Sequence, residues 1–178
     1  MRKILDSIIN VNGERKIIEG PVVDLRIRYV VDENQAFDGI PTVYYSILLH
    51  GTKERVGTID LRLKMDDDMY YYGHVGYGID LKYRGHHYSY EACKLVFNEA
   101  KNTYHLNELY LTCNPDNIAS YKTLQKLNGE LVEVVQVPKE HELYKRGDKL
   151  KCIFRYKISI WRLDIYLNDL LFQDISCY

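Results

Sequence analysis

Long apolar runs and closely paired cysteines are missing from this sequence of 178 residues. No segment approaches the roughly 20 apolar residues that a membrane-spanning helix needs. The opening residues meet an acid at Asp6 and develop no apolar core of the kind found in secretory signals. We therefore expect a cytoplasmic protein that has no membrane partner.

An excess of charge of one sign is also missing. The chain has 24 lysine and arginine residues against 25 aspartate and glutamate residues, which leaves a formal net charge of -1. Such a chain has no overall positive field that attracts nucleic acid. We expect no nucleic-acid partner, and any basic site has to be argued locally.

Metal-binding patterns are absent as well. The cysteines are far apart and lie among apolar neighbours, which predicts reduced packing residues rather than zinc ligands: Cys93, Cys113, Cys152 and Cys177. His86 and His87 are adjacent, so at a helix start their side chains diverge, and no third ligand is spaced to join them. We expect no metal.

No repeat or flexible linker divides the chain, so we expect one domain over residues 1–161. Residues 162–178 form an apolar tail in which Leu163, Leu167, Leu170 and Ile175 follow helical spacing. Three alternatives stay open for this tail: packing on the domain, pairing with a second subunit in a homodimer, or loose order.

Alternating apolar and polar residues predict strands in the first half of the chain. Residues 22–31 place Val23, Leu25, Ile27, Tyr29 and Val31 on one face. Residues 43–50 and 56–63 repeat the pattern around a glycine-containing loop, which predicts a hairpin. Residues 74–79 resemble a further strand, in which Gly76 and Gly78 weaken regular pairing and indicate either a bulge or a close backbone approach, so we expect something to lie against this strand.

The second half alternates between helical and strand patterns. Helical spacing predicts helices over residues 88–101 and 120–127, and strands are expected at 108–113, 130–137 and 151–161. The order is therefore a β-rich first half followed by β-α-β-α-β-β. This order indicates an α/β (α+β) fold with a mixed, mostly antiparallel central sheet flanked by helices.

Two strand-to-helix corners carry the chemistry. The first, Asp80 to His87, precedes a helix whose free backbone N–H groups and positive end suit a phosphate group. The second, Asn114 to Ser120, opens the next helix, so the two corners are expected to flank one cleft. For either corner alone, the alternative is an ordinary surface connection.

The corners resemble those of GNAT N-acetyltransferases. Arg84-Gly85-His86-His87-Tyr88-Ser89 is similar to the family pattern Q/R-x-x-G-x-G/A, and Asn117-Ile118-Ala119-Ser120 is similar to its Asn-x-x-Ser/Ala corner. His87 and Ser89 depart from the pattern, since the family has glycine at the first position and glycine or alanine at the second. The resemblance covers residues 56–137.

The resemblance implies an enzyme that moves an acetyl group from acetyl-CoA by direct attack of an acceptor amine, on a small molecule or a protein. It implies a sheet splayed between 74–79 and 108–113, with the pantetheine arm in the gap. The implied cofactor-binding residues are Ile79, Leu81, Arg84, Gly85, His86, His87, Tyr88, Ser89, Asn117 and Ser120.

Proton transfer is harder to assign. The family's usual acid, a tyrosine seven residues after the helix-opening asparagine, corresponds to Leu124 here. Tyr121 and Tyr144 are the candidate replacements among 17 tyrosines. His74 is the first candidate base, against the alternative of a strand-end histidine bonded to its neighbours, and Asp60 is the second.

Two other functions compete with this hypothesis. A regulatory acyl-CoA-binding protein without turnover would explain Leu124 and His87, whereas a different nucleotide-binding domain is disfavoured because no Gly-x-Gly-x-x-Gly sequence occurs. On the acceptor side, residues 32–42 are too few for the family's usual pair of helices. The loop 138–148 either attracts an amine through Glu140, Glu142 and Asp148 or is a solvated hairpin loop.

Overall fold

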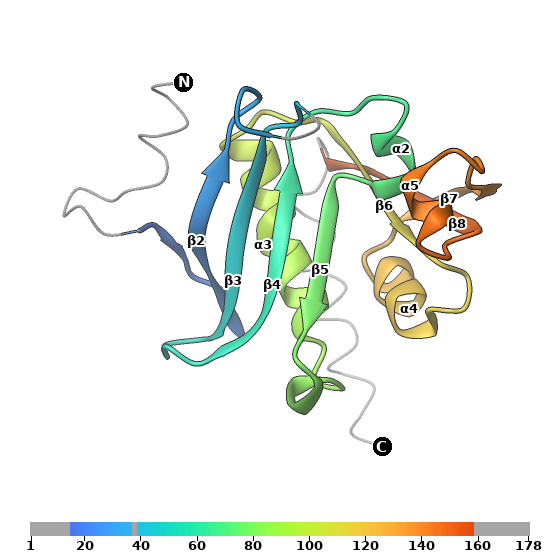
Figure 1. Ribbon diagram of the computed structural model, residues 1–178. Coiled ribbons are helices and arrows are strands. Elements are labelled where there is room, and N and C mark those ends of the chain that lie inside the picture. Colours follow the sequence, from blue (N-terminus) through green and yellow to red (C-terminus); the bar gives the residue numbers. More distant parts are fainter. Residues whose placement is uncertain (1–14, 37–38, 159–178) are drawn as a thin grey trace, which may run out of the picture.

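Two antiparallel sheets and five helical segments make up the computed structural model, which describes residues 15–36 and 39–158 (Figure 1). The first sheet has the order β1-β2-β3-β4-β5 and the second the order β6-β8-β7. The strands are β1 (Ile17–Ile18), β2 (Val23–Val31), β3 (Thr42–Leu49), β4 (Arg55–Arg62), β5 (Val75–Ile79), β6 (Glu108–Cys113), β7 (Glu130–Gln136) and β8 (Leu150–Lys157). The helical segments are α2 (Met69–Tyr72), η1 (Leu81–Tyr83), α3 (Tyr88–Asn102), α4 (Ile118–Lys126) and α5 (Glu142–Lys145).

The predicted strands and both long helices are confirmed, whereas β1 and the three short helical segments had not been predicted. One facing assignment was wrong: the register of β2 against β3 shifts between Ile27 and Tyr29, so Tyr29 leaves the buried face and is 46% exposed. A β-bulge of this kind reverses which residues face the core. Residues 159–161 of the last predicted strand and the tail 162–178 lie outside the described residues.

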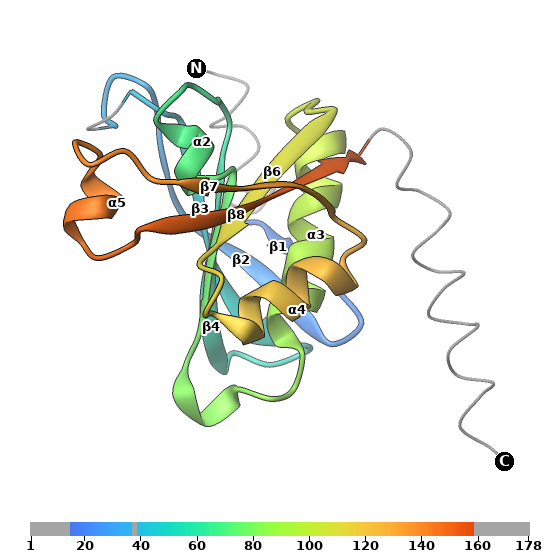
Figure 2. The same cartoon turned by 90° about the vertical axis from the view of Figure 1, so that its right-hand side faces the viewer.

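Helix α3 covers one face of the first sheet, and α4 lies beside it (Figure 2). The buried side of α3 consists of Ala92, Cys93, Val96, Phe97 and Ala100, each at most 1% exposed. Their spacing of three or four residues places them on one stripe of the helix, which is what an amphipathic helix buries. This stripe joins the two sheets into one core.

The opposite face of the first sheet carries no helix within the described part of the chain (Figure 1). Residues 32–36 and 39–41, which belong to the connection from β2 to β3, hold no helix, in line with the expectation that this connection is too short for a pair of helices. Among the described helices none is long and apolar enough to cross a membrane.

Strands β5 and β6 lie side by side without forming a ladder. At one end, the His74 N–H donates to the Tyr110 carbonyl (2.7 Å) and the Tyr110 N–H donates to His74 Nδ1 (3.0 Å). Beyond this point the strands separate toward their carboxyl ends at Ile79 and Cys113. The splayed sheet that the family resemblance implied is therefore present, and it has the shape of a wedge.

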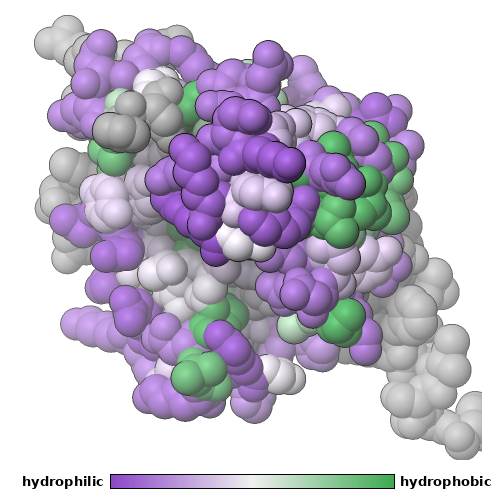
Figure 3. Space-filling model, turned by 45° about the vertical axis from the view of Figure 1, so that its right-hand side comes forward, coloured by the Kyte–Doolittle hydropathy of each residue, from purple (hydrophilic) through white to green (hydrophobic). Residues whose placement is uncertain are grey.

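Strand β7 ends the second sheet and exposes apolar side chains. Leu131, Val132 and Val134 are 42%, 43% and 52% exposed. Figure 3 shows a hydrophobic patch on its right-hand side. The register of β7 against β8 shifts between Leu131 and Glu133, and such bulges are one way in which edge strands limit further pairing.

Candidate active site

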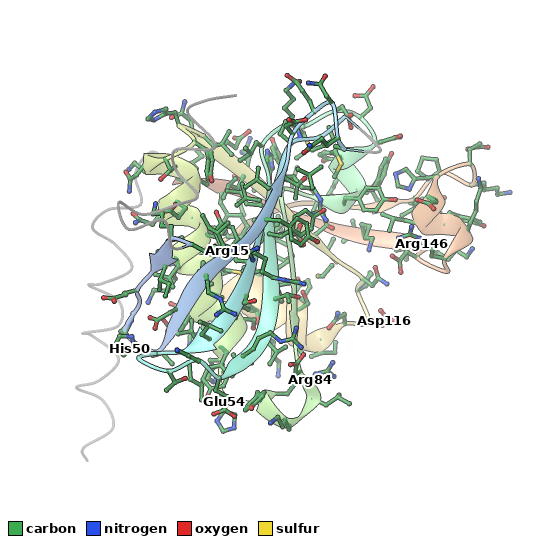
Figure 4. The ribbon with its side chains drawn as sticks, turned by 60° about the vertical axis from the view of Figure 1, so that its left-hand side comes forward. Arg15, His50, Glu54, Arg84, Asp116 and Arg146 are labelled. Atoms are coloured by element: carbon green, nitrogen blue, oxygen red, sulfur yellow. The ribbon has the colours of Figure 1, made fainter. Side chains whose placement is uncertain are left out.

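A groove of about 690 Å³ occupies the wedge between β5 and β6. Both predicted corners open onto it: Arg84, Gly85, His87, Tyr88 and Ser89 from the first, and Asn117 and Ser120 from the second. Figure 4 shows Arg84 on the η1 side of the opening and Asp116 on the α4 side. The sequence-predicted corners thus flank one groove.

The edge of β5 that faces the groove has unpaired backbone groups. The Asp80 N–H donates to the Val56 carbonyl (2.9 Å) and the Arg62 N–H to the His74 carbonyl (2.7 Å). Because backbone groups alternate between the two edges of an antiparallel strand, Tyr77 and Ile79 turn their N–H and C=O groups toward β6. The Ile79 carbonyl accepts a hydrogen bond from Arg84 Nε (3.2 Å). The Ile79 N–H faces the groove.

Leu81 does not share this edge. It begins the 3₁₀ turn η1, is 78% exposed and does not line the groove. Of the two backbone positions that the resemblance implied, the structure therefore brings only Ile79 to the groove, together with Tyr77.

The first corner has an unusual backbone. Gly85 and His87 both have left-handed conformations, with φ of 87° and 59°, and α3 begins directly after His87. A side chain is costly in this region of backbone space, by about 1–2 kcal/mol, so glycine is the usual occupant. The structure thus explains why the family pattern has glycine here, and His87 adopts the glycine conformation instead of a helical one.

The start of α3 presents donors to the groove. The first N–H groups of an α-helix have no intrahelical acceptor and carry the positive end of the helix dipole. At this point they belong to Tyr88, Ser89 and Tyr90, all of which line the groove. The ring of His86 stacks on that of Tyr88, with centroids 5.4 Å apart, but His86 itself does not line the groove.

At the second corner, Asn117 is the N-cap of α4. Its side-chain oxygen accepts a hydrogen bond from the Ser120 N–H (3.2 Å), which satisfies one of the free donors of the helix start. The Ser120 hydroxyl lies 2.8 Å from the Tyr77 hydroxyl, so a side-chain contact spans the groove from β5 to α4.

The close approach expected at Gly76 comes from a side chain of the neighbouring strand. A Cβ atom at Gly76 would lie 2.8 Å from Oδ1 of Asp60, so its small size accommodates a neighbouring side chain rather than a ligand. Gly78 has no atom within 4 Å of its Cβ position, so the space beside it is open.

The opposite end of the groove is lined by Arg62, Tyr71, Tyr72, Leu143 and Lys151. Each cation there has a carboxylate partner. Arg62 Nη2 lies 3.1 Å from Asp60 Oδ2, and Lys151 Nζ donates to Asp148 Oδ2 at 2.9 Å. Asp60 and Asp148 were considered from the sequence, but their basic partners were not: Arg62 is two residues further along β4, and Lys151 is three residues beyond Asp148, on β8.

His74, the first candidate base, is 6% exposed and does not line the groove. Its Nδ1 accepts the Tyr110 N–H, so a neutral ring carries its proton on Nε2 and offers no free lone pair. Burial lowers the pKa of His74 to about 4. These contacts favour the alternative of a histidine bonded at a strand end.

Asp60 faces competing effects. Burial raises the pKa of its carboxyl group, while Arg62 and the Gly76 N–H act in the opposite direction. Its Oδ2 atom is buried with no hydrogen-bond donor, although Arg62 lies close.

The two candidate acids do not reach the groove. The ring of Tyr121 packs edge-on against Phe154, with centroids 5.3 Å apart, and Lys149 Nζ lies 3.3 Å from the ring centroid of Tyr144. Neither tyrosine is among the groove-lining residues, and Leu124 is completely buried. Tyr77 lines the groove but was not predicted from the sequence. Its position between Gly76 and Gly78 was the signal that could have identified it.

Metal ligands do not gather in the part of the chain that the structure describes: it holds no group of three or more histidine, cysteine, aspartate or glutamate residues suited to a metal. Cys93, Cys113 and Cys152 are buried free thiols, and Cys177 lies outside the described residues.

Comparison with known proteins agrees with this geometry. The fold is shared with a GNAT-family acetyltransferase from Bacillus anthracis (19% identity, TM-score 0.53) and the ribosomal-protein-S5-alanine acetyltransferase of Vibrio fischeri (19%, 0.54). It is also shared with a ribosomal L7/L12 alpha-N-protein acetyltransferase in complex with coenzyme A (12%, 0.58). At such identities the likeness shows the fold alone.

These alignments cover 65%, 68% and 80% of this chain. They cover 66%, 64% and 98% of the other three chains, so the first two are matched over slightly less than two thirds of their length. A search of curated protein sequences finds no significant match.

The splayed sheet and its groove are those of the acyl-CoA N-acyltransferase fold. The family model "Acetyltransferase (GNAT) domain" matches residues 25–130, which is more than half of the chain. The chain therefore belongs to the GNAT acetyltransferase family, whose members are acyltransferases that use acetyl-CoA.

A first prediction separates the two roles of His74. Replacing His74 with alanine leaves the partly buried Tyr110 N–H without an acceptor, which costs about 1 kcal/mol of unfolding free energy, or up to about 3 kcal/mol if water cannot reach it. His74→Asn keeps an acceptor atom near the position of Nδ1 and should recover most of this loss. Denaturant unfolding of the three proteins measures it. Lost turnover in a fully stable His74→Asn variant would instead identify a base.

The pH dependence of stability gives a second readout of the same variants. The folded pKa of about 4 lies below the unfolded value of about 6.5, so the unfolded chain binds the extra proton between these values. The wild type should therefore lose stability as pH falls through this window, and the contribution of His74 to that loss should be absent from His74→Asn.

A second prediction concerns the left-handed backbone of the first corner. His87→Gly removes the strain of a side chain at positive φ and adds glycine's flexibility to the unfolded chain, for a net gain of about 0.5 kcal/mol. His86→Gly, at the adjacent residue without positive φ, should lose about 0.5–1 kcal/mol. Thermal unfolding compares the two, and equal losses would contradict the strain.

Proposed function

We propose that this chain transfers an acetyl group from acetyl-CoA to an acceptor amine, on a small molecule or on a protein. The observation that carries the proposal is the meeting of both corners at one groove whose β5 wall offers unpaired backbone groups. This arrangement supplies what the two ends of the cofactor need: helix-start donors for phosphates and a strand edge for the pantetheine amides.

The cofactor contacts follow from the lining residues. The N–H groups of residues 85–90 face the pyrophosphate, and Lys122 and Lys126 add positive charge on the α4 side of the same opening. In the structure, Arg84 Nε donates a hydrogen bond to the Ile79 carbonyl. This hydrogen bond breaks when the Arg84 side chain binds phosphate. Asn117 and Ser120 form the facing wall.

The reaction needs a donor for the oxyanion that develops on the thioester carbonyl. The N–H groups of Tyr77 and Ile79 are fixed by the β4–β5 ladder and face the gap. Either can donate to the developing oxyanion with little reorganisation of the protein. Of the sequence-predicted proton carriers, His74, Tyr121 and Tyr144 stay predictions without geometric support, because none of them lines the groove.

The acceptor enters at the end lined by Tyr71, Tyr72 and Leu143. Tyr71 also lines a neighbouring hollow of about 520 Å³ that contains Asp66 and Asp67, and these carboxylates attract a positively charged amine. The absence of helices from the described residues 32–36 and 39–41 leaves this side open, which suits acceptors of more than one size.

A second function is favoured by Leu124, which is completely buried where the family has its acid. In that case the chain binds acyl-CoA without turnover, as a regulatory protein. A cytoplasmic location, the lack of nucleic-acid and membrane partners, the single domain over 1–161 and a homodimer also remain proposals drawn from the sequence.

The cofactor site is tested by Arg84→Ala. A charge-assisted hydrogen bond to phosphate contributes about 1.5–3 kcal/mol, so the dissociation constant for acetyl-CoA should rise roughly 10- to 100-fold. Lys101→Ala, at the far end of α3, removes the same charge and should leave the constant unchanged. Isothermal titration gives both values, and an unchanged constant for Arg84→Ala would remove the phosphate assignment.

Turnover is tested by thiol release from acetyl-CoA with a panel of small amines and peptides. The proposal predicts release that depends on at least one acceptor. Tight acetyl-CoA binding with no release across the panel would favour the non-catalytic alternative, and no binding at all would contradict both.

A further inference from the structure

The tyrosines that line the groove lie at different places along it, so they are placed to contact different parts of a bound substrate. Tyr83 donates to Glu54 outside the groove, Tyr88 and Tyr90 lie at the start of α3, and Tyr71 and Tyr72 lie on α2 at the acceptor end. Tyr77 alone among these lies on β5 within the wedge, between the phosphate corner and the acceptor end.

The side chain of Tyr77 points across the wedge toward α4. Its hydroxyl lies 2.8 Å from the Ser120 hydroxyl on the first turn of that helix, while Leu124 occupies the next turn. The family's acid would project from α4 at Leu124; here a phenol from the opposite wall reaches the same helix.

We propose that Tyr77 is the residue that protonates the departing CoA thiolate in this chain, in place of an acid on α4. The inference rests on the proposed acetyl transfer, and it assigns a chemical role to a residue that the motif did not include. A fully buried leucine on the helix and a partly buried phenol on the strand are complementary observations: the acid lies on the opposite wall of the groove from the family's.

The proton balance is straightforward. The neutral amine nitrogen attacks the carbonyl carbon and forms the C–N bond, and the C–S bond then breaks with its electron pair going to sulfur. Sulfur takes the proton of the Tyr77 hydroxyl and leaves as the thiol. The amide nitrogen loses one proton, which returns to the Tyr77 oxygen through water or the Ser120 hydroxyl, so no other reactant is needed.

The surroundings of the phenol support this role. Either hydroxyl of the Tyr77–Ser120 pair can donate, so Ser120 can donate to the phenol oxygen and leave the phenol proton free for sulfur. Burial raises the pKa of Tyr77 and keeps it protonated, while the hydroxyls of Ser120 and Thr123 act in the opposite direction by stabilising the phenolate.

The experiment compares two acetyl donors of the same shape. Selenols are much stronger acids than thiols, so the selenoester analogue of acetyl-CoA releases a leaving group that does not need a proton. With an acceptor from the amine panel, single-turnover transfer from acetyl-CoA by Tyr77→Phe should fall about 100-fold, the lower end of the range for general acid catalysis. Transfer from the selenoester should stay within about threefold of wild type.

Matched variants keep the test interpretable. Tyr29→Phe, on β2 and outside the groove, removes a phenol hydroxyl elsewhere in the chain and should leave both rates unchanged. Tyr77→Phe retains the ring, and its acetyl-CoA dissociation constant should match the wild type by titration.

Each outcome decides a separate point. An equal loss with both donors would show that Tyr77 only shapes the groove, and no loss with either donor would place the acid elsewhere; both overturn the assignment. Absence of transfer by the wild type itself would instead contradict the proposed function, and the two failures are therefore distinct.

Discussion

The parting of β5 from β6 is the constraint on which the rest of the site depends. The exchange of two hydrogen bonds between His74 and Tyr110 fixes the closed end of the wedge. From there the strands diverge, and the space between them is the groove that both corners enter. Core packing by α3 joins the sheets behind the wedge, so the strands can separate on one side without separating the domain.

The wedge also explains why the chemistry is distributed as it is. A strand edge without a partner exposes donors and acceptors that must pair with something, and Tyr77 and Ile79 present such groups to the groove. In the described state Arg84 satisfies one of them by donating to the Ile79 carbonyl. A hydrogen bond therefore joins Arg84, which we propose as a phosphate ligand, to the strand edge before acetyl-CoA binds.

Much of this architecture could be predicted from the sequence. Alternation and helical spacing located the long strands and helices, because each buries one face, and two short motifs located the corners. The bulge at Tyr29 could not be predicted, since a shift of register leaves no signature in apolar alternation. Short segments such as α2 and α5 have too few residues to show a period.

The roles of individual polar residues were the least predictable part. The sequence shows His74 only as a histidine at the start of a strand. That its Nδ1 accepts a hydrogen bond from the Tyr110 N–H depends on the position of β6. Gly76 indicates close approach, but the approaching group comes from Asp60 on the neighbouring strand. Both contacts depend on which strands are neighbours, which the sequence does not state. Tyr77 was not singled out because the chain has 17 tyrosines.

The most direct measurement is a crystal structure of the chain with acetyl-CoA. The account predicts the pantetheine arm between β5 and β6, paired with the backbone of Tyr77 and Ile79, and the pyrophosphate against the N–H groups of residues 85–90 with Arg84 released from Ile79. A cofactor bound elsewhere, with the wedge empty and the bond from Arg84 to Ile79 intact, would contradict it.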